Sequence, residues 1–192
     1  MKKTLLISIF ILVSALSAQA NEIKRIFVGN ESAKISIIAF ESLTCSHCAN
    51  FHKDVYPLLK KEYLDTGLAK IEFRHFPLDI AAFNASKVAQ CKNDGNLEIL
   101  ESLYANQQKW VKGSSIEEAN INLQKFLSKE GFNIDFESCI NNKQIEDFVL
   151  NDRIDGAKNF KVNATPTIII NNKKFEKTLN YKNLKKALEK LI

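Results

Sequence analysis

An apolar stretch at residues 35–40, ISIIAF, is followed almost at once by two cysteines with two residues between them, Cys45 and Cys48. The stretch is short, rich in β-branched residues and nearly all apolar, which is typical of a buried β-strand. Beyond the pair, apolar side chains recur at helical spacing and predict an amphipathic helix. These side chains are Cys48, Phe51, Val55, Leu58, Leu59 and Tyr63. The cysteines therefore lie at a strand-to-helix junction, and the rest of the fold has to be arranged around it.

The remaining pattern indicates an α/β or α+β fold. Pro57 should kink or interrupt the first helix, and the alternation over residues 69–76 predicts a second strand. From residue 79 to about residue 160 the periodicity is helical. A strand–helix–strand unit at the start and a β-hairpin near the end favour a mixed fold. The last elements expected are a buried strand at 167–170, a turn at 171–172, an edge strand at 173–176 and a helix with Tyr181, Leu184, Leu188 and Leu191 on its inner face.

The first twenty residues have the features of a secretory signal peptide. Lys2 and Lys3 precede an apolar run at 5–16, and the small residues at 17–20, SAQA, predict cleavage near Ala20. The apolar run is too short to span a bilayer comfortably, which disfavours a membrane anchor. We therefore expect an exported, periplasmic protein with no stable membrane insertion after cleavage.

The charge of the chain gives little support for a nucleic-acid partner. The formal net charge is +5, and removal of Lys2 and Lys3 lowers it to about +3. The lysines are scattered, and no basic stripe is interleaved with aromatic residues. Clusters such as Lys60-Lys61 are interpreted as solvated helix faces.

The position of Cys45 predicts a reactive thiolate. With Thr44 as the N-cap, Cys45 would lie among the unpaired N–H groups of the first helical turn, which stabilise negative charge together with the helix dipole. An imidazolium at His47 would lower the thiol pKa further. A stabilised thiolate favours the reduced protein, so the disulfide becomes a stronger oxidant and Cys45 a better leaving group. Cys48, one turn further on, is expected to be more buried and to resolve a mixed disulfide.

Three other uses of this stretch are weighed against redox chemistry. The ligands of a zinc site would be Cys45, His47, Cys48 and His52. A closed structural zinc site usually takes its second ligand pair from a distant segment, and the other two cysteines stand apart. A purely structural disulfide would close too short a loop to add much stability, and a c-type haem site would need a histidine where Ala49 stands. His52 is expected on the helix surface or in a groove, outside the chemistry.

The motif Cys45-Ser46-His47-Cys48 after an apolar strand resembles the active site of the thioredoxin superfamily. The long helical segment, HFPLD at 75–79 and VNATPT at 162–167 before a strand resemble its DsbA branch. The resemblance covers almost the whole chain after residue 20. It implies a thioredoxin fold with an inserted helical domain. The divisions are a signal peptide at 1–20, thioredoxin-fold parts at 21–78 and 144–192, and the helical insertion at 79–143.

The resemblance also implies roles for single residues. Cys45 becomes the exposed nucleophile, Cys48 its partner, and His47 the group that stabilises the thiolate. Pro166 becomes a cis-proline that lies against the cysteines and helps to bind extended peptide, with Thr165 touching and tuning the redox pair.

The chain departs from the family pattern in two places. Related proteins often carry a buried acid where Ala39 stands, and the nearest acid here is Glu41. This departure leaves open whether any residue takes the proton-transfer role that the resemblance gives to such an acid, and Glu41 could be merely exposed. The dipeptide between the cysteines is Ser-His rather than the commoner Pro-His, which leaves the reduction potential open.

Cys91 and Cys139 both fall in the helical segment. If paired, they would close a long loop, which chain entropy makes worth about 4 kcal/mol. The alternative is two buried free thiols that behave as small apolar residues. Export favours the structural disulfide.

These features predict an oxidoreductase that donates its Cys45–Cys48 disulfide to reduced, unfolded exported proteins. By resemblance, a membrane protein of the DsbB type would reoxidise it. No cofactor and no metal are expected, and the protein is expected to be a monomer. The alternatives are a reductase or an isomerase of the same fold, and an exported metal-binding protein. Isomerases usually carry a separate dimerisation domain, for which residues 21–33 are too few.

Overall fold

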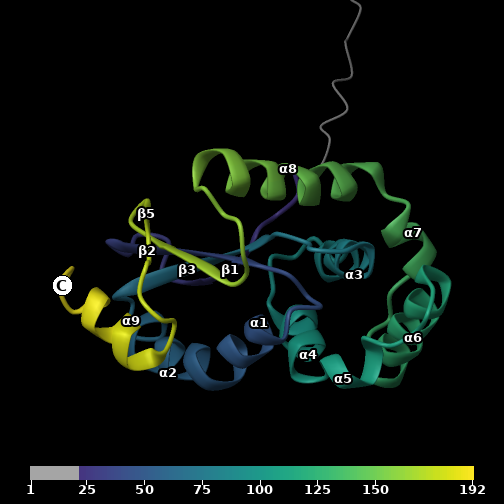
Figure 1. Ribbon diagram of the computed structural model, residues 1–192, viewed down its shortest axis with the longest axis horizontal. Helices are drawn as coiled ribbons and strands as arrows, with labels where there is room; N and C mark the ends of the chain where they lie inside the picture. Colours follow the sequence, from purple (N-terminus) through teal and green to yellow (C-terminus); the bar gives the residue numbers. More distant parts are fainter. Residues whose placement is uncertain (1–21) are drawn as a thin grey trace, which may run out of the picture.

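The computed structural model describes residues 22–192, and the expected signal peptide at 1–20 lies outside them. The described chain forms a five-stranded mixed sheet in the order β1-β3-β2-β4-β5, flanked by helices (Figure 1). The strands are β1 (Ile26–Gly29), β2 (Ile35–Glu41), β3 (Ala69–His75), β4 (Thr167–Ile170) and β5 (Lys173–Lys174).

The sheet combines one parallel pair with three antiparallel pairs. β2 and β3 are parallel, as a strand–helix–strand crossover requires. β1 pairs antiparallel with β3, β4 with β2, and β5 with β4. The expected strands at 35–40 and 69–76 are therefore present with ends shifted by one residue, whereas the edge strand is shorter than the expected 173–176.

The sequence pattern did not predict β1, because four residues are too few to show a clear alternation. Its last residue, Gly29, has a φ of 105°, and a Cβ there would lie 2.6 Å from the backbone oxygen of Ala69. Glycine thus lets this edge strand approach β3 closely.

One continuous helical run carries the cysteine pair and leads away from it. Its parts are α1 (Ser46–Asn50), the π-helical turn η1 (Phe51–Val55), α2 (Tyr56–Leu59) and a second π-helical turn, η2 (Lys60–Leu64). We call this run, residues 46–64, the redox helix. Pro57 lies in the first turn of α2, and the expected interruption takes the form of a change to π-helical geometry on either side.

The long helical segment follows β3. The helices of this segment are α3 (Ile80–Gln90), α4 (Glu98–Ala105), α5 (Gln107–Trp110), α6 (Ile116–Lys129), α7 (Phe136–Ile140) and α8 (Lys143–Asn159). A last helix, α9 (Tyr181–Leu188), follows the hairpin. Because α9 ends at Leu188, the prediction that Leu191 lies on its inner face is wrong, and Leu191 is 42% exposed. None of the helices within residues 22–192 combines the length and apolar character needed to cross a bilayer.

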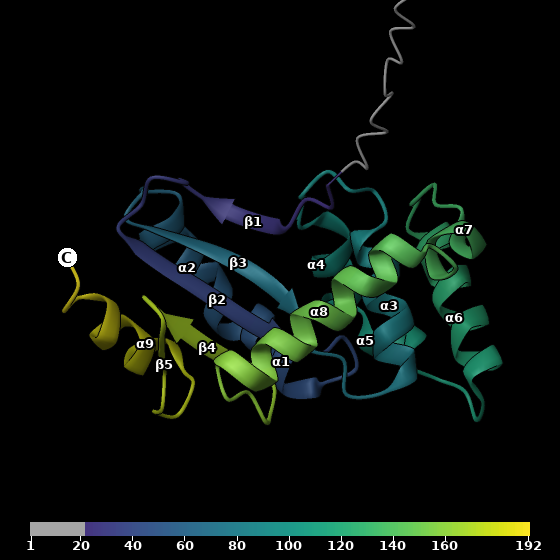
Figure 2. The same cartoon turned by 90° about the horizontal axis from the view of Figure 1, so that it is seen from above.

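The helices form a layer on each face of the sheet. α8 covers one face, whereas α1, α2 and α9 cover the other (Figures 1 and 2). The side chains of β2 alternate accordingly: Ile37 and Ala39 join the large core cluster beneath the redox helix, and Ile38 and Phe40 join a smaller cluster. The large cluster also contains buried residues of α3, α4 and α6, so the helical segment shares its core with the sheet.

Candidate active site

Cys45 is itself the N-cap residue of α1, with extended backbone angles. The prediction that Thr44 caps this helix is wrong, because the Thr44 hydroxyl donates instead to Asp79 Oδ2 at 2.6 Å. Asp79 in turn caps α3 by accepting from the Ala82 N–H. The sulfur of Cys45 therefore occupies the place where a capping oxygen is usually found, facing the N–H groups of the first turn.

The environment of Cys45 strongly favours a thiolate. Its pKa falls from the usual 9.0 to about 5, chiefly because the Cys48 thiol donates a hydrogen bond to it. Partial burial opposes this shift. The Thr165 hydroxyl and the backbone N–H groups of Cys48 and His47 lower the pKa further. Cys45 is half-buried, so a thiolate there remains within reach of a partner sulfur.

Cys48 has the opposite character. Its side chain is fully buried, and burial raises its thiol pKa well above the usual value. The hydrogen bond to Cys45 and the negative charge of Glu41 raise it further. The described residues therefore contain one thiol that is unusually acidic and one that is unusually hard to deprotonate, three residues apart in sequence and not joined in a disulfide.

Thr165 and Pro166 directly precede β4, and this segment lies next to Cys45. The Thr165–Pro166 peptide bond is cis, and the Cys45 thiol lies 3.4 Å from the Thr165 backbone oxygen, to which it donates. The Thr165 hydroxyl is buried and has no hydrogen-bond partner among the described residues. It is therefore free to donate to a thiolate at Cys45, which accounts for its contribution to the lowered pKa.

A groove of about 500 Å³ runs beside these residues, between the redox helix and the start of α9. We call it the proline groove; its walls include His47, Phe51, Thr165, Pro166, Leu179 and Tyr181. His47 is exposed at its rim, and the backbone N–H of His47, rather than its imidazole, contributes to the Cys45 pKa. Stabilisation of the thiolate by the imidazole remains a prediction.

Two residues that sequence reasoning left outside the site are buried beneath it. The side chain of His52 is only 6% exposed, and its Nε2 lies 2.9 Å from Oε2 of Glu41, which is 3% exposed. His52 lines a groove, as expected, but its side chain is buried rather than on the helix surface. The expectation of an exposed Glu41 is wrong. The signal for Glu41 was present in the strand period, which puts it on the same face as Ile37 and Ala39.

The four residues of the metal alternative do not converge. His52 turns inward to Glu41, and His47 stands exposed on the other side, at the rim of the proline groove. Among residues 22–192, no group of three or more His, Cys, Asp or Glu side chains is placed to hold a metal ion.

Cys91 and Cys139 lie apart from the redox pair. Cys91 is the C-cap residue of α3 and Cys139 belongs to α7, and a disulfide joins the two, with their Cα atoms 5.5 Å apart. The bond links two helices of the helical segment that are distant in sequence.

A family model described as thioredoxin matches residues 21–190. A Rickettsia typhi protein that carries the name of a protein-disulfide oxidoreductase is 26% identical over 171 residues, covering 86% of this chain and 61% of that protein. The chain thus spans about three fifths of the length of this relative. Disulfide bond formation protein D of Bacillus subtilis is 26% identical over 174 residues, covering 85% of this chain and 75% of that protein.

Solved structures with the same fold include proteins of the DsbA type. The crystal structure of Wolbachia pipientis alpha-DsbA1 matches with a TM-score of 0.77 and 28% identity, over 87% of this chain and 90% of that one. The oxidised BdbD structure from Bacillus subtilis, at 22% identity and a TM-score of 0.71, covers 87% of this chain and 92% of that one and shares the fold. With a thioredoxin-fold sheet, a helical insertion and a Cys-x-x-Cys pair at a helix start, this chain belongs to the thioredoxin superfamily, in its DsbA-like branch.

Proposed function

We propose that this chain is an exported thiol:disulfide oxidoreductase that donates the Cys45–Cys48 disulfide to reduced proteins. The observation that carries this proposal is the unequal acidity of the two thiols. An acidic thiol at Cys45 stabilises the reduced protein as its thiolate, and whatever stabilises the reduced form makes the disulfide a stronger oxidant. Cys45 is also the more accessible of the two sulfurs.

The reaction is a pair of thiol–disulfide exchanges. A substrate thiolate attacks Sγ of Cys45, the Cys45–Cys48 bond breaks, and the thiolate of Cys48 leaves and takes up a proton. A second substrate thiolate then attacks the substrate sulfur of the mixed disulfide. A substrate disulfide forms, and Cys45 leaves as a thiolate. Two electrons pass from two substrate thiols to the cysteine pair. The low pKa of Cys45 favours the second step, because an acidic thiol is a good leaving group.

The proline groove is suited to hold the substrate segment during this exchange. It borders Cys45 through Thr165 and Pro166, and its apolar wall includes Phe51 and Leu179. An extended segment in this groove would present its cysteine to Cys45 and not to the buried Cys48. We expect little sequence selectivity, since unfolded substrates offer backbone and apolar contacts of many kinds.

The setting of the reaction belongs to the same proposal. The expected signal peptide at 1–20 would send the chain to the periplasm, where reduced, newly exported proteins are the substrates. A membrane protein of the DsbB type would reoxidise the cysteine pair, and the chain would act as a monomer. The name of the Bacillus subtilis relative, a disulfide bond formation protein, supports the oxidising direction.

The reduction potential of the Cys45–Cys48 pair tests the direction of transfer. Equilibration of the protein with glutathione redox buffers should give a value more positive than about −200 mV, the range of oxidising members of this superfamily. A value near about −270 mV, as in thioredoxin, would instead support the alternative function of a reductase.

A single and a double serine variant test which cysteines carry the redox reaction and which only stabilise the fold. Cys45→Ser should abolish oxidation of a reduced, unfolded test protein, because no accessible sulfur remains to form the mixed disulfide. Cys91→Ser with Cys139→Ser should keep that activity but lower the free energy of unfolding by about 4 kcal/mol, the chain-entropy value for a loop of this length. Equal loss of activity in both folded variants would contradict the assignment.

A further inference from the structure

A side chain of the helical segment bonds to the backbone that carries the reactive cysteine. Gln107, the first residue of α5, donates from Nε2 to the backbone oxygen of Leu43 at 2.7 Å and to that of Cys45 at 3.0 Å. A side-chain amide nitrogen carries two hydrogens, so both bonds form at once. One neutral side chain therefore holds the chain on both sides of the Thr44–Cys45 peptide bond.

The Leu43 carbonyl depends on this contact. Leu43 is fully buried and lies between the end of β2 and the start of α1, outside both elements. Within residues 22–192, no backbone N–H donates to its oxygen. Buried backbone oxygens are nearly always paired. The strand-to-helix junction would therefore have to rearrange if residue 107 could no longer donate.

Gln107 is itself held firmly by the helical segment. Trp110, three residues later in α5, is fully buried and donates from Nε1 to the backbone oxygen of Leu103 at 2.9 Å. Asn106, the residue before Gln107, donates from its side chain to the backbone oxygen of Ser102 at 2.9 Å. Both acceptors belong to α4, which packs against the redox helix. The amide of Gln107 is thus presented to the junction from a fixed position.

The carbonyl of Cys45 matters because it determines where the Cys45 sulfur lies. The same oxygen accepts from the N–H groups of Cys48 and Ala49, each at 3.2 Å, and so begins the redox helix. The sulfur is held by the backbone N–H groups of His47 and Cys48. Because the backbone rotates freely only about φ and ψ, a fixed carbonyl limits how far this sulfur can turn away from the first helical turn.

We propose that Gln107 is a positioning residue, through which the helical segment holds the Cys45 sulfur against the first turn of the redox helix. Without its two bonds the junction shifts, and the sulfur moves off the N–H groups that stabilise its thiolate. The reduced protein then loses stability, so the disulfide becomes a weaker oxidant. This inference deepens the proposed function and rests on it for the direction of transfer, whereas the acidity of Cys45 is measured without it.

Gln107 carries no charge, so its effect can be separated from that of the charged groups nearby. The titratable groups around Cys45 and Gln107 are His47 and Cys48 of α1, Lys53 of η1, Glu41 of β2, Glu101 and Tyr104 of α4 and Lys109 of α5. Methionine has nearly the shape of glutamine but no donor, so Gln107→Met leaves all of them in place. A change in the Cys45 pKa of this variant therefore reports on geometry.

The first measurement is the pH dependence of Cys45 alkylation. Reduced protein is treated with iodoacetamide at pH values on both sides of the midpoint, and the product labelled at Cys45 is quantified by mass. The parent midpoint should lie at about 5. In Gln107→Met and in Gln107→Ala it should rise, with a fall of about three- to tenfold in the acid dissociation constant, the effect expected from losing one hydrogen bond's net contribution.

The second measurement is the equilibrium with glutathione at a pH well above the midpoint. The equilibrium constant for reduction of the Cys45–Cys48 disulfide should fall by a similar factor in both variants, because stability lost by the thiolate is lost by the reduced protein. A purely structural role of Gln107 would destabilise the oxidised and the reduced protein alike. It would leave both the midpoint and the equilibrium constant at their parent values.

Two control variants separate the loss of these bonds from other effects. Gln108 is the next residue of α5 and its side chain is exposed, so Gln108→Ala should keep the parent midpoint and equilibrium constant. Cys91→Ser with Cys139→Ser should destabilise the helical segment without removing a donor from the junction. The Cys45 midpoint of this double variant should therefore also stay at the parent value.

Three outcomes would overturn an assignment, and they are distinguishable. Values within about twofold of the parent in folded Gln107→Met and Gln107→Ala would remove the positioning role and leave the proposed function intact. An equal shift in either control would also remove it, because the effect would not belong to the two bonds of Gln107. A parent equilibrium in the range of reductases would remove the proposed function, whereas a raised midpoint in the Gln107 variants would still support the positioning of Cys45.

Discussion

At the scale of single residues, the site depends on where one sulfur lies in a helix. Cys45 is the N-cap, so its thiolate faces the N–H groups that a serine or aspartate oxygen would otherwise accept from. The Cys48 thiol and the Thr165 hydroxyl add two further donors. Cys48, one turn later, is buried instead, which explains how two neighbouring thiols acquire pKa shifts of opposite sign.

The reactivity of Cys45 should follow this donor set as pH changes. Alkylation by iodoacetamide needs the thiolate, so the rate for the reduced parent should be flat above its pKa and fall as pH drops through about 5. In Cys48→Ala the midpoint should move upward, because the largest stabilising hydrogen bond is lost. Thr165→Ala should move it upward by less. A parent midpoint near the usual 9.0 would contradict the structure of the site.

At the scale of elements, close packing of α8 on the sheet positions the segment that leads to Pro166. Gly156 lies inside α8, where glycine is unfavourable for helix formation. A Cβ at this position would lie 2.8 Å from the ring of Phe40, which is fully buried in β2. The ring also packs against Phe76 and Phe160 and has little room to move aside. Because Gly156 has no side chain, α8 can lie this close to the Phe40 ring of β2.

Gly156→Ala should destabilise the protein even though alanine is the better helix former. The expected loss is about 1–2 kcal/mol, from overpacking of about 1–3 kcal/mol against a helix-propensity gain of up to about 1 kcal/mol. Urea unfolding gives this difference. Asn151→Ala, on the exposed side of α8, is the matched control and should change stability by no more than about 0.5 kcal/mol. A Gly156→Ala protein more stable than the parent would show that the helix and the sheet can move apart freely.

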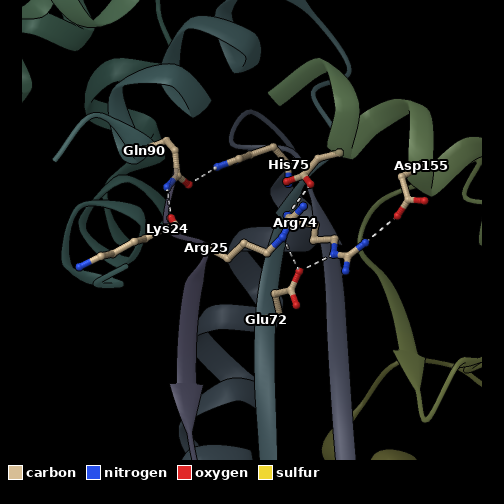
Figure 3. A network of polar contacts seen from close by, with 8 residues as sticks. Lys24, Arg25, Glu72, Arg74, His75, Gln90 and Asp155 are labelled. Carbon is tan, nitrogen blue, oxygen red and sulfur yellow. Dashed lines mark hydrogen bonds and ion pairs between the residues drawn. The ribbon is translucent and has the colours of Figure 1, made fainter. Parts of the chain in front are cut away.

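At the scale of the whole molecule, a polar network ties together segments that are distant in sequence (Figure 3). Asp152 of α8 is buried, accepts from Arg25 at 2.5 Å, and accepts from the His75 N–H at 3.1 Å. His75 contacts Gln90 of α3, which donates to the backbone oxygen of Lys24. The end of β3, the segment before β1 and two helices are thereby fixed to one another.

Asp152→Asn should show how much this network contributes. The variant keeps the shape but loses the charge that holds Arg25, so we expect a loss of about 1–3 kcal/mol, less than for a fully buried pair because Arg25 is 37% exposed. Asp155→Asn breaks the more exposed ion pair with Arg74 and should cost less than about 1 kcal/mol. If both variants lost the same free energy of unfolding in urea, the buried ion pair of Asp152 would contribute no more stability than the exposed pair of Asp155.

Much of the fold could be predicted because its signals are local. The apolar run before Cys45, the helical spacing after it and the turn at Asn171-Asn172 each describe a short stretch whose period or turn chemistry sets its structure. The pattern failed where a stretch is short or ends early, as at β1 and at Leu191, because a few residues show no reliable period.

The sequence by itself determined that a cysteine pair opens a helix after a buried strand, with the second thiol within reach of the first to lower its pKa. Only the tertiary structure decided what surrounds that pair. Thr165 reaches Cys45 across 120 positions of sequence, and Glu41 meets His52 across a strand end and a helical turn. No local period encodes such contacts, because they depend on how the sheet and the redox helix pack. His52, expected at the helix surface or in a groove, thereby becomes a buried partner of Glu41.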